Sequence, residues 1–213
     1  EMRFVVPTQL ADFFQYPPLD NQPIPEPSKL RQLREGGFLL FPGPPEPWSI
    51  IDMLRICPEF FRQCPEMHPA GFWYEGIKYP QKFALRNLPP TKWYALRSSP
   101  AEGSIDLEWE RQQLIPKSEI AESVPDAVLV VWAMLLFSKV YGQQLFNTIW
   151  VRTSAQISIF SSPKESIHTL GPQVYVGTDE GKIVLGFHRQ KQMAPNHKKK
   201  PGIGVAITMS LET

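Results

Sequence analysis

Three acidic residues occupy alternate positions in the segment IDLEWE: Asp106, Glu108 and Glu110, here called the acidic triplet. Alternate residues of a β-strand lie on one face, so a strand here would gather the three carboxylates and place the apolar residues opposite. Carboxylate oxygens are the ligands that Mg²⁺ and Mn²⁺ prefer, and a metal-dependent hydrolase would use them in this way. The same alternation is typical of a half-buried strand with a solvated acidic face. The pattern favours the solvated strand and leaves the metal site as the alternative.

Two cysteines and a histidine form a second spaced group, with Cys57, Cys64 and His68 in the pattern C-x6-C-x3-H. A structural zinc site needs four ligands, usually including close cysteine pairs, and no fourth ligand lies nearby. A nucleophilic thiolate would need a base, which the sequence does not identify. Buried structural cysteines are the better interpretation.

The pair Glu180 and Lys182 has the Glu-x-Lys spacing found in one large class of metal-dependent nucleases. In those enzymes the motif lies inside a strand, whereas here Asp179-Glu180-Gly181 predicts the turn of a β-hairpin. Turn chemistry alone explains these residues. The chain has no G-x-S-x-G elbow, and no P-loop or G-x-G-x-x-G sequence follows a strand, so no cofactor is expected.

Basic residues gather near the end of the chain, where residues 181–211 hold six lysines and arginines and no acid. Five of them define what we call the basic loop: Arg189, Lys191, Lys198, Lys199 and Lys200. The net charge of +1 provides no general attraction to nucleic acid, but a local cluster can still bind phosphates. Lysine runs are also common at solvated loop tips, and this one has no interleaved aromatic residues. Anion or nucleic-acid binding by the basic loop is therefore a weak prediction.

The clearest structural element is a helix from Ser123 to Gly142. It contains eleven consecutive apolar residues, Ala127–Phe137, too few for a membrane span, which needs about 20. A helix that is apolar on every side is buried in protein. Ser123 and Asp126 have the spacing of an N-terminal capping box, and Gly142 is a left-handed terminator.

Four predicted strands follow this helix, at residues 149–153, 173–178, 182–188 and 203–209. The last of them alternates Ile203, Val205, Ile207 and Met209 with smaller or polar residues. Burial of the apolar faces of helix and strands requires two layers. We therefore expect an α+β fold, with an antiparallel sheet of about four strands packed on one buried central helix.

The first half of the chain is rich in proline, with 17 of the 23 prolines in residues 1–100. Proline breaks helices and is excluded from central strands, so short helices and strands joined by rigid turns are expected. A strand is predicted at Phe38–Phe41, and Ser49 with Asp52 predicts a helix that begins with a capping box. The segment NQPIPEP (Asn21–Pro27) predicts an extended strap across the protein surface, with a polyproline-type ligand as the alternative.

The composition changes near Pro100, which suggests a lobe at residues 1–100 and a core at 101–213, or a single domain of 1–213. Two later stretches, KFALRNLPP and WYALRSSP, share Ala-Leu-Arg and would place Arg86 and Arg97 at equivalent positions if they were paired strands. Chance or a shared strand-to-turn solution explains so short a match better. Among the tryptophans of the first half, Trp48, Trp73 and Trp93 are candidates for exposed anchors.

Two cysteines are too few for a disulfide framework, which favours a reducing, cytoplasmic environment. No signal peptide is visible, although the first residue is Glu1, so a preceding segment stays an open question. The sequence is most consistent with a non-enzymatic binding or interaction protein that has a protein partner, possible nucleic-acid contact through the basic loop, and no membrane association. The alternative is the metal-dependent hydrolase, and a small-ligand-binding or structural protein of a mobile element is a third option. The oligomeric state is open.

Overall fold

The computed structural model describes residues 4–14, 24–62, 81–90, 92–117, 121–160, 168–187 and 202–211. Its helices, with short 3₁₀ turns written η, are α1 (Pro7–Phe14), α2 (Pro27–Glu35), α3 (Ile50–Ile56), η1 (Pro58–Phe60), η2 (Lys82–Leu85), α4 (Trp109–Gln112) and α5 (Ala127–Tyr141). Its strands are β1 (Phe38–Pro42), β2 (Trp93–Arg97), β3 (Glu122–Ser123), β4 (Ile149–Phe160), β5 (His168–Asp179), β6 (Lys182–Phe187), β7 (Gly202–Val205) and β8 (Thr208–Met209).

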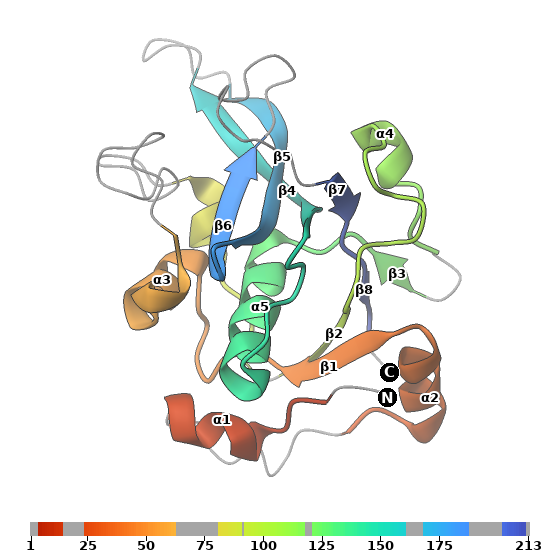
Figure 1. The fold of residues 1–213 in the computed structure, drawn as a ribbon, viewed down its shortest axis with the longest axis vertical. Coiled ribbons are helices and arrows are strands. Elements are labelled where there is room, and N and C mark those ends of the chain that lie inside the picture. The colour runs from red at the N-terminus through yellow and green to blue at the C-terminus, as the bar shows by residue number, and fades with distance from the viewer. Residues whose placement is uncertain are drawn as a thin grey trace.

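These strands form two sheets of four strands each, and the predicted α+β class is confirmed. The first sheet has the order β1-β2-β8-β3 and is antiparallel throughout. The second has the order β6-β5-β4-β7 and packs over α5, which also contacts α1 and α3 (Figure 1). Because β1 and β2 pair in one sheet with β8 and β3, the two halves of the chain share a layer. The division at residue 100 stays a prediction.

The strands predicted from the second half of the chain form the second sheet, with one difference in direction. β7 runs parallel to β4, with Trp150 opposite Ile203 and Arg152 opposite Val205. β6 and β7 therefore run in the same direction, which requires a long connection, and residues 188–201 provide one. The predicted antiparallel arrangement of these four strands is therefore wrong for the pair β4 and β7.

The predicted strand 203–209 is divided between the two sheets. β7 ends at Val205, β8 begins at Thr208, and the two residues between them are fully buried. Ala206 N donates to Arg152 O in the second sheet, and Ile207 O accepts from Arg97 N in the first. The alternating pattern continues across the change of sheet because both sheets bury apolar faces. Periodicity alone therefore could not show that the predicted strand is divided.

Helix α5 buries the whole apolar run, with Ala127–Phe137 between 0 and 6% exposed. Its N-cap is Asp126, whose Oδ1 accepts from Val128 N at 3.3 Å, and Gly142 ends it with φ 63°. The predicted cap at Ser123 is wrong, because Ser123 pairs with Thr208 in the first sheet. Within the described residues, no helix combines the length and apolar character needed to span a membrane.

The short elements of the first half follow their local signals. The strand at Phe38–Phe41 is present as β1, and α3 begins with the predicted capping box. Along β1, Leu39 and Phe41 face the main core around α5, whereas Phe38 and Leu40 face a second, smaller core. The first sheet thus separates two apolar clusters, which explains why every residue of β1 is buried.

Candidate functional site

The acidic triplet does not lie on a strand, which corrects the sequence prediction. Asp106 occupies a turn with φ 60°, Glu108 is the residue before α4, and Glu110 lies within that helix. The turn is held against β7, because Asp106 N donates to Ile203 O at 2.9 Å and Asp106 Oδ1 accepts from Ile203 N at 3.1 Å. This pairing with a strand 97 residues away replaces the extended backbone that local alternation had suggested.

The positively charged side chain of Arg152 interacts electrostatically with these carboxylates. Arg152 on β4 is half-buried, and burial lowers the pKa of its guanidinium, while attraction to the acidic triplet opposes this and favours the charged form. Arg152 Nη1 donates to Gln112 Oε1 at 3.0 Å and to Leu107 O at 3.3 Å. In the part of the chain that the structure describes, no three His, Cys, Asp or Glu residues form a group suited to a metal ion. Attraction to the triplet thus favours the charged form of Arg152, and the three carboxylates do not share a strand face as the hydrolase alternative assumed.

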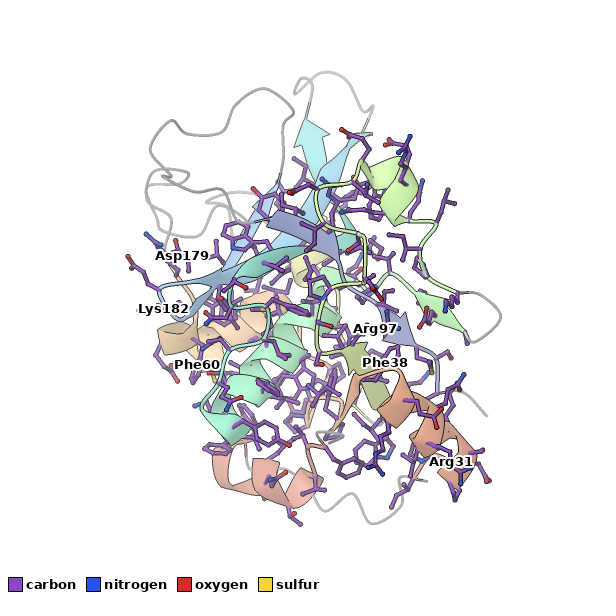
Figure 2. The ribbon with its side chains drawn as sticks, turned by 45° about the vertical axis from the view of Figure 1, so that its right-hand side comes forward. Arg31, Phe38, Phe60, Arg97, Asp179 and Lys182 are labelled. Atoms are coloured by element: carbon purple, nitrogen blue, oxygen red, sulfur yellow. The ribbon has the colours of Figure 1, made fainter. Side chains whose placement is uncertain are left out.

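The other predicted groups divide between described and undescribed residues. Cys57 is buried, and burial raises the pKa of its thiol, which disfavours the thiolate. Cys64 and His68, like the whole basic loop, lie outside the described residues, so these predictions stay untested. Glu180 and Gly181 form the turn between β5 and β6, next to the labelled Asp179 and Lys182 in Figure 2. The connection has two residues rather than the predicted three, since Asp179 pairs with Lys182.

The two Ala-Leu-Arg stretches have different structures: the first is mainly η2 and the second contains β2. Even so, both arginines meet carboxylates that precede α5. Arg86 pairs with Asp126, and Arg97 Nη2 lies 3.4 Å from Oε1 of the buried Glu122. Arg97 also lies over the ring of Phe38, at 5.4 Å from its centroid, and the two labelled side chains lie close together in Figure 2.

A groove of about 820 Å³ lies at one end of the first sheet, and it is here called the Trp93 groove. Five segments line it: residues 24–26 before α2, 86–89 after η2, 92–94 at the start of β2, 123–129 from β3 into α5, and 208–211 from β8 onward. Its volume lies within the range of about 300–1,000 Å³ that is usual for ligand sites. Segments far apart in sequence thus converge on one surface depression.

Two aromatic residues at the start of β2, Trp93 and Tyr94, line the groove. The Trp93 ring packs on Phe4 with centroids 5.4 Å apart, and its Nε1 is buried without a hydrogen-bond partner among the described residues. Tyr94 donates its hydroxyl proton to Pro89 O at 3.0 Å, and burial raises its pKa to about 12. The Tyr94 phenol is therefore neutral and hydrogen-bonded, whereas the Trp93 N–H has no acceptor among the described residues.

Two charged residues that line the groove, Arg86 and Asp126, pair with each other. Asp126 both caps α5 and accepts from Arg86 Nη1, so the pair joins the loop after η2 to the start of the helix. This anchors two of the lining segments to each other. What remains inside the groove is mainly apolar: the rings of Trp93 and Tyr94, the prolines, and the aliphatic side chains.

Of the three tryptophans predicted as anchors, one lines this groove. Trp48 packs against Trp132 of the main core, with centroids 5.6 Å apart, and Trp73 lies outside the described residues. Neither Tyr94 nor the residues around Pro89 were predicted as anchors. Their signal was the proline pair Pro89–Pro90 shortly before an aromatic pair at the start of a strand, which is too short to have been distinctive.

No protein-family model, no curated protein and no solved structure matches this chain. The groove and its residues are therefore the basis on which a function can be proposed.

Proposed function

We propose that this protein is a binding module that holds an extended polypeptide segment of a partner protein in the Trp93 groove. The observation that carries the proposal is the indole N–H of Trp93, a groove-lining residue whose Nε1 is buried without an acceptor among the described residues. An unmade hydrogen bond of this kind costs about 1–3 kcal/mol, and such groups are rare in native proteins. A partner that brings an acceptor into the groove would recover this free energy.

The groove wall supports a polypeptide rather than a small molecule. Residues 24–26 of the chain itself line the groove outside any helix or strand, with Pro25 buried and Ile24 66% exposed. The remaining walls are mainly apolar, with Pro89, Pro125 and Val128 among their residues. A further extended segment would meet the same rigid, apolar surfaces.

The basic loop forms a separate part of the proposal, as an additional contact for anions or nucleic acid. Its support is the local excess of lysine and arginine in the sequence. Polynucleotide binding at low salt tests it: a salt-dependent affinity that falls when Lys198, Lys199 and Lys200 are replaced by glutamine supports it. Salt-independent or absent binding overturns it. A cytoplasmic location, favoured by the cysteine content, belongs to the same proposal.

A variant that fills the groove tests the main proposal. Ser123 is exposed and lines the groove, so Ser123→Arg places a long charged side chain there without entering the core. Ser28, exposed on α2 and not among the residues that line the groove, provides the matched control Ser28→Arg. Proteins captured from lysate by the wild type and by the control, but not by Ser123→Arg, support the proposal. A reproducible partner that binds Ser123→Arg as well as the wild type would show that the groove is not the site.

A further inference from the structure

We draw no further inference here: the strongest candidate, a polar cavity of about 330 Å³ lined by the end of α2, the start of β1 and the residues that follow α5, carries nothing, because nothing in the structure shows that the buried Oε1 of Gln144, which has no hydrogen-bond partner among the described residues, faces this cavity.

Discussion

Gln112 accepts a hydrogen bond from Arg152, whose Nη1 lies 3.0 Å from the amide oxygen. The Gln112 side chain is fully buried, and its Nε2 donates to Ser104 O at 2.7 Å and to Ile203 O at 2.9 Å. One amide therefore joins α4, the turn at Ser104, β7 and β4. The donation to two carbonyls fixes which end of the amide is nitrogen, and the arginine completes its hydrogen bonding.

Replacement of Gln112 by alanine should destabilise the protein strongly. The change leaves two buried carbonyls without a donor and removes an acceptor from a half-buried arginine, so we expect the free energy of unfolding to fall by about 3 kcal/mol. Urea denaturation measures it. The neighbouring Gln113 is exposed, and Gln113→Ala should change stability by no more than about 0.5 kcal/mol. Equal effects of the two substitutions would show that the buried amide is not a structural centre.

Replacement of Glu180 should stabilise the hairpin between β5 and β6. Glu180 and Gly181 both have positive φ, 50° and 76°, the signature of a two-residue type I′ turn that prefers Asn-Gly. Glu180→Asn should raise the free energy of unfolding by about 0.5–1 kcal/mol, because asparagine tolerates this conformation better than glutamate. A second Glu-Gly pair provides the control: Glu102 precedes Gly103 but does not itself have positive φ, so Glu102→Asn should bring no gain. A gain in both variants would point to charge removal instead.

Two aromatic rings lie against glycines on the second sheet, and one of these contacts permits a double-mutant test. A Cβ added to Gly177 would lie 2.3 Å from Cδ1 of Trp150, so Gly177→Ala should cost about 1–3 kcal/mol of stability. In a background of Trp150→Ala the clash is absent, and the same substitution should cost much less. Thermal unfolding of the four proteins of this cycle gives the coupling energy. Additive effects would show that the ring does not occupy the space above Gly177.

The elements that sequence analysis predicted best are those whose signals are local. The apolar run of α5 and its stop at Gly142, the capping box at Ser49, and the hairpin at Gly181 each depend on residues within a few positions of one another. Ser123 and Asp126 were equally plausible caps by local chemistry, and the choice is made by pairing of Ser123 with Thr208, a tertiary contact. Local signals therefore predicted the elements but not every boundary.

The candidate sites were harder to predict because their partners are distant in sequence. The acidic triplet showed the spacing of a strand, but Arg152 and Ile203, which explain it, lie about 40 and 100 residues away. The Trp93 groove needs five separate segments, and only Trp93 was predicted beforehand as a candidate exposed anchor. A single sequence contains the residues of such a surface without showing that they meet.

Acid should weaken the first turn of α3. Burial by itself would raise the pKa of Asp52, but hydrogen bonds from the Ser49 hydroxyl and amide, with the attraction of Arg55, outweigh it and lower that pKa below 3.8. A lowered folded-state pKa contributes stability that is present above about pH 4 and is lost as the pH falls through the folded value. Ser49→Ala should cost about 1 kcal/mol at neutral pH, and the difference from wild type should shrink in acid. Ser28 lies inside α2, whose N-cap is Glu26, so a pH-dependent loss in Ser28→Ala as well would contradict the assignment.

Alkali should act on the groove through Tyr94. Burial raises the pKa of this phenol from 10.0 to about 12, so its contribution to stability is fully present below pH 10 and is lost as the pH rises through 12. Tyr94→Phe has no ionisable group at this position. It loses the hydrogen bond to Pro89 O at neutral pH, but the wild type's advantage over it should shrink and then disappear as the phenol ionises. Ultraviolet absorbance of tyrosinate provides the direct measurement: the component missing from Tyr94→Phe should have its midpoint near pH 12. A midpoint near 10 would show that the phenol is open to water, and the lining of the Trp93 groove by a half-buried, neutral Tyr94 would then be incorrect.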